Sequence, residues 1–491
     1  MRRNDLRWMK MERIAIGWSS VDITPKKRCT LCGQFPTRIS TGVHDPLTAS
    51  ALAISSGRGR SGSIIISADA LWISDRVRTI FDRELARRLP EVPAGRVLVS
   101  ATHTHTAPTQ VCWFSDESDW IGGGIMTPDQ YSAFLGRRLA EAAANAWRAR
   151  RPGFVAWGYG YAVVGHNRRA CYRDGSAVMY GPTAAPMFSH IEGHENHGID
   201  LLFTFGEDRR LTGMVVNVCC PSQCTEGESF VSADFWHETR EELRRRYGPE
   251  LHVLPQCGAA GDQSPHLLLD RRADERMLRL KGLLPEQGGD FSMAQRREIA
   301  LRISAAVNDV LPAAMKDMRE RVVLGHERTV VRIPLRRMSP ADEDFCRTRA
   351  ALAEERVNAL LREKRPQTDP ELTSWRRQMT YFRDALERNR QAADGEAALP
   401  VEIHAVRVGD AAFCSNRFEF CLDFGERIRA RSPALQTFVV QLAGEGGYLA
   451  PARAEEGGGY GAWYPSTLIG SEGGDVVVEE SLKALGRLFG S

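Results

Sequence analysis

The sequence predicts an α/β fold in which a mixed β-sheet core is covered by helices. Short apolar runs rich in β-branched residues alternate along the chain with longer segments whose apolar residues recur every three or four positions. Such alternation is typical of sheets packed between helices. The 491 residues are enough to bury a substantial core, and we expect residues 1–491 to form a single domain.

The first part of the chain contains clear examples of both patterns. Val77, Phe81 and Leu85 fall on one helical stripe after Ser74, a residue type that caps helices. Thr127 precedes a proline, which favours the first turn of a helix. In this part, strands are expected at Ala51–Ile54, Ser63–Ile66 and Arg96–Ser100, and helices after Ser74 and Thr127.

The second part repeats the alternation around a helix that Gly248 ends. In order, we expect a strand at Met214–Val218, a helix at Asp234–Tyr247, and strands at His252–Pro255, Val401–Val406, Ala411–Cys414 and Thr437–Leu442.

A change of composition separates residues 339–396 from the rest. The segment is rich in Arg, Glu, Gln and Ala and is interrupted at Pro366 and Pro370, which predicts a helical hairpin inserted into the domain. Because acidic and basic residues are mixed throughout, the charges indicate solvated helical faces. A lid over a site and an arm for dimerisation are both open alternatives.

The overall composition excludes some classes of partner. The chain has 65 Lys and Arg against 62 Asp and Glu, so no strong field favours nucleic acid. We expect no membrane span and no export signal, and eleven cysteines in mixed contexts fit reduced thiols in a cytoplasmic protein. A small-molecule substrate is expected, and a homo-oligomer stays open.

Two histidines follow one of the expected strands. His103 and His105 lie in the segment Ser100–Thr106, directly after an apolar β-branched run. Residues two apart on extended backbone share a face, so one imidazole can bind a metal while the other donates a hydrogen bond. An isolated pair of this kind is more often a surface or hydrogen-bonded pair.

A second motif, Gly261–Pro265, follows the strand expected at His252–Pro255. Gly258 and Gly261 permit a tight turn, which can present backbone N–H groups and the Ser264 hydroxyl to a substrate or a water. The plain alternative is a structural turn in which Asp262 and Ser264 cap a helix.

Five segments, taken in order, carry a resemblance to a known family: Ser100–Thr106, Gly261–Pro265, Asn416–Glu419, Gly447–Tyr448 and Gly459–Tyr460. Together they resemble the catalytic core of the neutral/alkaline (non-lysosomal) ceramidases, whose members are zinc amidohydrolases. The opening Gly17–Pro25 resembles the start of that family as well. The resemblance implies a ceramidase-like catalytic domain that carries the helical hairpin as an insertion.

The resemblance also implies a role for each matched residue. One Zn²⁺ per chain would be bound by His103, Glu419 and Tyr448, with Cys220 at the position of the family's second zinc histidine. His105 and Tyr460 would stabilise the oxyanion, Ser264 would orient water or substrate, and Arg168 would reach the substrate.

Cys220 is a departure from the family's pattern. A cysteine thiolate is a good zinc ligand, so a site of His, Cys, Glu and Tyr is chemically reasonable. The alternative is a metal site that is lost or altered.

From these residues we predict a zinc-dependent hydrolase that cleaves an amide, or N-acyl, bond with metal-activated water. Because the recognised core fills nearly the whole chain, a smaller or more polar amide than ceramide is expected. The alternatives are an ester or glycosidic bond at the same site, and a homologue that binds without catalysis.

Overall fold

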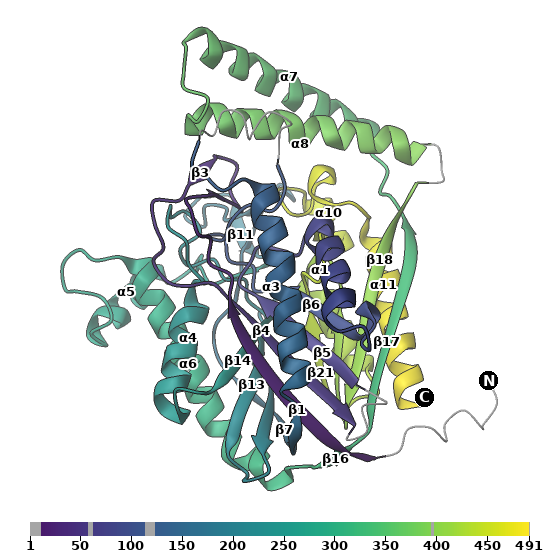
Figure 1. The fold of residues 1–491 in the computed structure, drawn as a ribbon. Coiled ribbons are helices and arrows are strands. Elements are labelled where there is room, and N and C mark those ends of the chain that lie inside the picture. Colours follow the sequence, from purple (N-terminus) through teal and green to yellow (C-terminus); the bar gives the residue numbers. More distant parts are fainter. Residues whose placement is uncertain (1–10, 57–61, 113–122, 394–396, 491) are drawn as a thin grey trace.

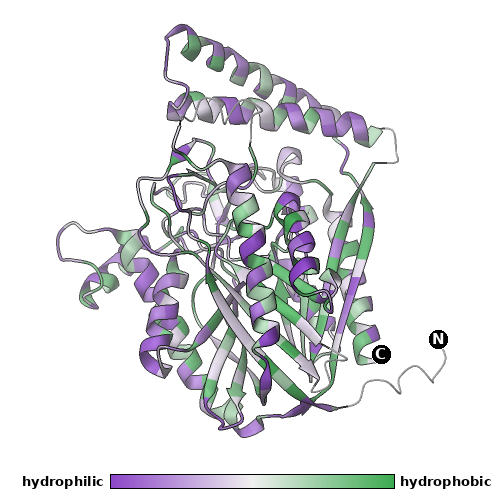
Figure 2. Ribbon diagram, viewed as in Figure 1, coloured by the Kyte–Doolittle hydropathy of each residue, from purple (hydrophilic) through white to green (hydrophobic). Residues whose placement is uncertain are grey.

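Two β-sheets pack face to face and are covered on both outer sides by helices, which gives four layers (Figure 1). The computed structural model describes residues 11–56, 62–112, 123–393 and 397–490. Apolar residues concentrate in the strands, while the outer helices carry many hydrophilic residues (Figure 2). The predicted α/β class, a mixed sheet core covered by helices, is confirmed.

The larger sheet has nine strands and mixed direction. β5 and β6 run parallel, as do β13 and β14, and the other neighbours are antiparallel. In spatial order the strands are β14 (His252–Cys257), β13 (Leu211–Val218), β12 (Gly198–Gly206), β7 (Arg151–Tyr161), β1 (Glu12–Asp22), β4 (Thr48–Ser56), β5 (Gly62–Ala68) and β6 (Val97–Ala101), and β16 (Arg321–Val322) pairs with β1.

The smaller sheet packs its apolar face on the larger one. Its strands, in spatial order, are β17 (Leu324–Pro334), β18 (Ala398–Val408), β19 (Ala411–Ser415) and β21 (Gln436–Val440). Phe413 and Phe438 stack with ring centroids 4.4 Å apart and share a core with Leu52 and Val215 of the larger sheet. Burial of this shared face joins the two sheets into one body.

Helices cover the outer faces in three groups. α1 (Asp75–Arg88) and α3 (Pro128–Arg148) share a core with β4 and β5. α4 (Phe235–Tyr247) and α6 (Phe291–Ala314) share one with β12 and β13. α9 (Leu422–Arg431) and α11 (Ser471–Phe489) pack on the smaller sheet. α5 (Arg271–Leu280) contacts α6, and α10 (Ala452–Gly457) contacts α11.

The expected elements of the sequence are found with small changes of length. Ser74 caps α1 by accepting from the N–H of Val77 at 3.2 Å, and Thr127 forms a capping box with Gln130 at the start of α3. Every expected strand overlaps an observed strand. Residues 1–10 of the expected single domain lie outside the described residues.

The segment 339–396 forms two long helices that lie across the top of the molecule (Figure 1). α7 (Pro340–Arg362) and α8 (Pro370–Ala393) pack against each other, and residues 394–396 lie outside the described part of the chain. None of the described helices is both long enough and apolar enough to cross a membrane.

Candidate active site

His103 occupies a strained position directly after β6. Its φ of 66° lies in the left-handed region, which residues with a side chain rarely adopt. The conformation is held by the backbone N–H, which donates to the Ala70 carbonyl at 2.9 Å. Ring atom Nδ1 donates to the Leu71 carbonyl at 2.9 Å. The other ring nitrogen, Nε2, therefore points away from the backbone.

Glu419 meets this nitrogen from the opposite half of the chain. Its Oε2 lies 3.2 Å from His103 Nε2. Two short strands, β20 (Glu419–Phe420) and β22 (Tyr448–Leu449), pair in parallel with Glu419 opposite Tyr448. The Tyr448 hydroxyl donates to the Glu419 carboxylate. Three residues that the sequence assigned to a metal site are thus brought together.

Charges around Glu419 keep it ionised although it is buried. Burial acts to raise the pKa of the Glu419 carboxyl, but His103, Arg168 and Tyr448 outweigh it and leave the pKa below its usual value. Glu419 therefore places a negative charge among the three residues His103, Glu419 and Tyr448, here called the floor of the candidate site.

The turn Gly261–Pro265 joins the two halves of the site. The N–H of Gly261 donates to the Phe420 carbonyl at 2.9 Å, and a Cβ at this glycine would lie 2.5 Å from the Glu419 carbonyl oxygen. Asp262 accepts from the N–H of Leu422 at 3.0 Å, at the start of α9. Only glycine permits this approach, which holds Glu419 in place.

Arg168 connects most of the matched residues. It lies between β8 (His166–Asn167) and β9 (Arg169–Tyr172) and is 1% exposed. Its guanidinium donates to the Gly261 carbonyl at 2.9 Å and the Tyr448 hydroxyl at 3.3 Å, and lies 3.7 Å from Glu419 Oε2. Burial acts to lower the pKa of Arg168, but Tyr448, Tyr180 and Glu419 outweigh it and raise the pKa well above its usual value.

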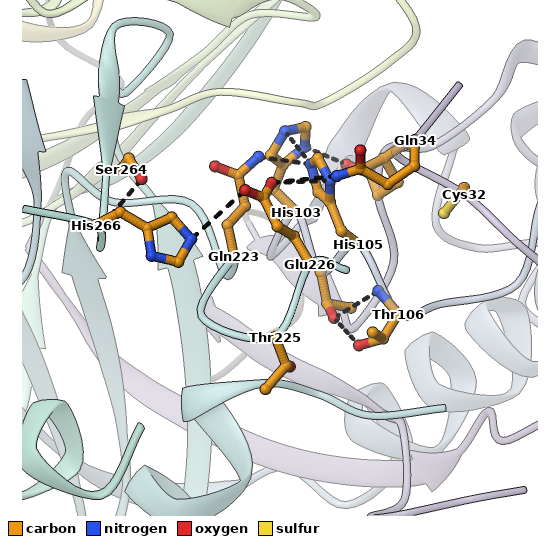
Figure 3. A network of polar contacts seen from close by, with 12 residues as sticks. Cys32, Gln34, His103, His105, Thr106, Gln223, Thr225, Glu226, Ser264 and His266 are labelled. Atoms are coloured by element: carbon orange, nitrogen blue, oxygen red, sulfur yellow. Dashed lines mark hydrogen bonds and ion pairs between the residues drawn. The ribbon is translucent and has the colours of Figure 1, made fainter. Parts of the chain in front are cut away.

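Gln223 fixes the tautomer of His105 (Figure 3). Arg168 donates to Gln223 Oε1 at 3.1 Å, so the amide nitrogen faces His105 Nε2, at 2.6 Å. His105 Nε2 must then accept, and Nδ1 carries the proton. Burial first, and then the charges of His103 and Arg38, hold the pKa of His105 well below its usual value, which leaves it neutral.

The predicted catalytic residues Ser264 and Tyr460 each contact a tyrosine that lies next to Arg168. Ser264 is in β15 (Gln263–Ser264), which pairs with β8, and its Oγ accepts from the Tyr180 hydroxyl at 3.0 Å. Tyr460 contacts Tyr448 with ring centroids 5.6 Å apart. Tyr460 is 37% exposed as a whole residue. Its hydroxyl is nevertheless buried, and this burial raises the pKa of the hydroxyl.

Cys220 is the predicted ligand that the structure does not bring to this group. Its thiol contacts the carbonyl oxygens of Val164 at 3.6 Å and Pro221 at 3.4 Å. Burial, with Cys257 and Asp234, raises the pKa of this thiol well above its usual value. Its assignment as a ligand stays a prediction.

The donors at the floor fit a cation in part. His103 Nε2 faces Glu419 Oε2 at 3.2 Å and His105 Nε2 at 3.4 Å. Because both of these atoms are acceptors, the arrangement needs a proton on His103 Nε2 or a cation between the three atoms. Imidazole, carboxylate and phenol oxygen are acceptable zinc donors. Across the described ranges, however, no three His, Cys, Asp or Glu side chains form a metal-binding group. His103, Glu419 and Tyr448 are the residues whose side chains have suitable atoms to bind a cation here.

The structure adds three polar residues that the sequence analysis did not single out: Gln223, Glu226 and Tyr180. Glu226 Oε2 lies 3.5 Å from His105 Nδ1, and His266 contacts the same carboxylate (Figure 3). Gln223 stands three positions after Cys220 in the same loop, and this proximity was the one available signal.

Comparisons with known proteins agree with this geometry at the level of the fold. No family model matches the sequence, and no curated protein sequence matches it. The structure resembles that of neutral ceramidase from Pseudomonas aeruginosa, with a TM-score of 0.68 and 15% identity over 98% of this chain and 75% of that chain. A ceramidase structure complexed with C2 has a TM-score of 0.66 and 15% identity over 97% and 75% of the two chains.

The chain therefore has a ceramidase-like fold along nearly its whole length. The predicted resemblance is confirmed at that level.

Proposed function

We propose that this protein is a ceramidase-like hydrolase that cleaves an amide, or N-acyl, bond with water. The observation that carries the proposal is the contact of His103 Nε2 with Glu419 Oε2 at 3.2 Å, between segments from opposite halves of the chain. The fold shared with neutral ceramidase structures supports it. In the reaction the C–N bond breaks, the water oxygen joins the acyl carbon, and acid and amine leave.

The residues around the floor have separate tasks in this proposal. Arg168 holds Tyr448 and Gln223 in place through hydrogen bonds. Ser264, whose Oγ already accepts from Tyr180, keeps its own proton to donate to a water or a substrate oxygen. Tyr460 stays protonated because burial raises its pKa, so its hydroxyl is available to donate to a developing oxyanion.

The hydrogen bonds of His105 restrict how it can act in this proposal. Since Nε2 accepts from Gln223, its proton is on Nδ1, on the side of Glu226. Stabilisation of an oxyanion by His105 then uses the Nδ1 proton, or follows displacement of the Gln223 amide by substrate.

Zn²⁺ is the proposed cofactor, one per chain. His103, Glu419 and Tyr448 would hold it, with Cys220 as the predicted fourth ligand. When bound, zinc supplies a water activated near neutral pH and polarises the scissile carbonyl.

The placement of Cys220 favours a second candidate, a homologue that binds a small molecule without catalysis. Its thiol contacts two carbonyl oxygens, and the buried Arg168 cation lies 3.7 Å from Glu419. In this arrangement the floor offers three protein ligands for zinc, His103, Glu419 and Tyr448, and lacks a fourth. Ester and glycosidic substrates remain alternatives within the hydrolase proposal.

Metal content and hydrolysis, measured together, separate these candidates. Elemental analysis of the parent protein should give about one zinc per chain, and His103→Ala and Cys220→Ala should both lose it. His197→Ala and Cys219→Ala are matched controls, because His197 pairs with Glu195 and Cys219 is a buried neighbour. Both controls should keep the metal.

Hydrolysis is then assayed on amides, esters and glycosides, the first two with a common acyl group. Release of acid from an amide, lost in His103→Ala, supports the proposal. If the Cys220→Ala variant keeps its zinc, Cys220 is not a ligand and the proposed protein ligands are His103, Glu419 and Tyr448. Absence of metal even after zinc is supplied, with no hydrolysis, would overturn the hydrolase and promote the binding homologue.

A further inference from the structure

Glu226 lies beside His105 of the candidate site, and its contacts with neighbouring nitrogen atoms are long. Gln34 Nε2 lies 3.4 Å from its carboxylate, and His105 Nδ1 and His266 Nε2 each lie 3.5 Å away. All three distances exceed the usual 2.9–3.0 Å or so of a good N–H···O bond. Three nitrogen atoms therefore face this carboxylate, but each is farther away than in a strong hydrogen bond.

Among the described residues, the ion-pair contacts of Glu226 are with two histidines, His105 and His266, each at 3.5 Å. The Glu226 side chain is 23% exposed and that of His266 27%. A ligand that enters the site can therefore reach both groups.

The hydrogen-bond donors and acceptors around Glu226 determine which chemical groups of a ligand can bind there. A hydroxyl both donates and accepts, so it can donate to Glu226 and accept from Gln34 or His266. An ammonium group has only donors and would face the donors of Gln34 and His266, and a carboxylate would face Glu226. Hydroxyl groups fit all three residues together.

Two partly exposed aromatic rings contact the residues around this carboxylate. Tyr180 and Tyr460 are each 37% exposed, and Tyr180 contacts His266 with ring centroids 6.0 Å apart. Tyr460 contacts Phe35, the neighbour of Gln34, with ring centroids 6.1 Å apart. Flat, partly exposed rings beside a polar cluster suit a ligand with C–H faces and hydroxyl edges.

We propose that Gln34, Tyr180, Glu226, His266 and Tyr460, here called the rim, bind the hydroxyl groups of an N-acylated, polyhydroxylated amine, an amino sugar in its simplest form. Glu226 is the specificity-determining residue, because it is the rim's one anionic acceptor. This inference rests on the proposed function for the bond that is cleaved, but the binding itself does not require cleavage.

The test compares three probes that share one acyl group. N-acetylglucosamine carries the hydroxyls, N-acetylcyclohexylamine has a six-membered ring without them, and N-acetylsphingosine has two hydroxyls on a long apolar chain. Dissociation constants are measured by calorimetry or ligand-observed NMR, and acetate release is measured separately. N-acetylglucosamine should bind at least tenfold more tightly than N-acetylcyclohexylamine.

Glu226→Gln keeps the size of the side chain and removes its charge. Binding of N-acetylglucosamine should weaken about tenfold, since a hydrogen bond to a charged group is lost, while binding of N-acetylcyclohexylamine should not change. Glu228→Gln is the matched control, because Glu228 lies on the same loop and is exposed. It should bind all three probes as the parent does.

The outcomes separate this inference from the proposed function. If acetate is released from N-acetylsphingosine alone, the hydrolase stands and the inference is overturned. Equal binding of N-acetylglucosamine by the parent and Glu226→Gln also overturns it. If N-acetylglucosamine binds in a Glu226-dependent way but no probe releases acetate under any metal supplementation, the inference stands and the hydrolase fails.

Discussion

The floor of the candidate site and the α7–α8 hairpin above it are built in different ways. The floor consists of His103, which follows β6, and of Glu419 and Tyr448, which lie opposite each other in the β20–β22 pair. All three side chains are largely buried. The hairpin instead reaches the site through single side chains, most of them on α8, while Phe345 of α7 contacts Trp463 with ring centroids 5.3 Å apart.

Those contacts hold two loops that border the site. Arg377, 1% exposed, donates to the Gln34 carbonyl at 2.8 Å. The Tyr381 hydroxyl hydrogen-bonds to Ser466 Oγ at 2.6 Å, and Ser466 Oγ accepts from the N–H of Gly461 at 3.0 Å, next to Tyr460. The floor is therefore inseparable from the fold, whereas the hairpin acts on the site through identifiable side chains that can be changed singly.

The largest effect is expected at the floor. Glu419→Gln keeps the shape of the side chain but leaves Arg168 and His103 without their buried anion. Loss of a partner from a buried ion pair costs about 3 kcal/mol, and we expect hydrolysis to fall roughly thousandfold. Denaturant unfolding and the rate of acid release measure the two effects. Parent-like hydrolysis in this variant would remove Glu419 from the proposed site.

A smaller effect is expected where the hairpin meets the Tyr460 loop. Tyr381→Phe removes the hydroxyl that joins Ser466 and Trp463 but keeps the ring contact with Phe35. We expect kcat to fall about tenfold with KM nearly unchanged, and stability to fall by about 1 kcal/mol. The measurement is steady-state kinetics with thermal unfolding.

Tyr464→Phe is the control for that variant. Tyr464 belongs to the same cluster as Tyr381, but the hydrogen bonds to Ser466 and Trp463 are made by the Tyr381 hydroxyl. Loss of the Tyr464 hydroxyl should therefore leave kcat unchanged. If both variants lower kcat equally, the hairpin acts through packing and not through the Tyr381 hydroxyl.

Acid should weaken the contact between α1 and the smaller sheet, where Glu402 of β18 pairs with Arg78 of α1 at 3.5 Å. Burial acts to raise the pKa of Glu402, but His404, Arg328 and Arg78 outweigh it and hold the pKa well below its usual value. Because the folded pKa is lowered, the stabilisation is complete above the unfolded pKa of about 4.3. It is lost as the pH falls through the folded value. Stability measured from pH 6 downward should therefore decline less steeply in Glu402→Gln, and an identical slope would contradict this.

The smallest effect is expected inside the hairpin. Arg383 of α8 pairs with Glu354 of α7 at 2.8 Å, and both side chains are about half exposed. Exposed pairs contribute about 0.5 kcal/mol or less. Arg383→Ala should therefore leave unfolding and hydrolysis within that margin. A loss above 2 kcal/mol would mean that the hairpin is coupled to the core as tightly as the floor is.

The sequence predicted the site where its residues are close in the chain and less where they are not. His103 and His105 follow a strand two residues apart, and the pattern indicated that their rings would meet, which they do with centroids 4.9 Å apart. The expected extended backbone is wrong, because β6 ends at Ala101 and His103 has a left-handed φ of 66°. Glu419, Tyr448 and Tyr460 depended on the family resemblance. Gln223 and Glu226 acquire partners only when loops from distant segments meet, and no local pattern encodes that.

Some elements of the fold were also beyond local patterns. β7 contains Gly158 and Gly160, which are poor strand formers, and α6 has apolar residues on most of its sides. The structure explains both: a Cβ at Gly158 or Gly160 would lie 2.4 or 2.6 Å from Val310 of α6. The helix approaches the strand closely there, so glycine is required and helical periodicity is obscured.

The distribution of the floor over both halves of the chain affects how the protein is made. The segment that contains His103 and Arg168 leaves the ribosome well before Glu419 and Tyr448 are synthesised. Until the smaller sheet docks, the apolar face of the larger sheet, including Leu52 and Val215, has nothing to cover it. Newly made chains therefore pass through a stage in which this apolar face is exposed to solvent. A chain that stops before β18 is expected to aggregate or to require a chaperone.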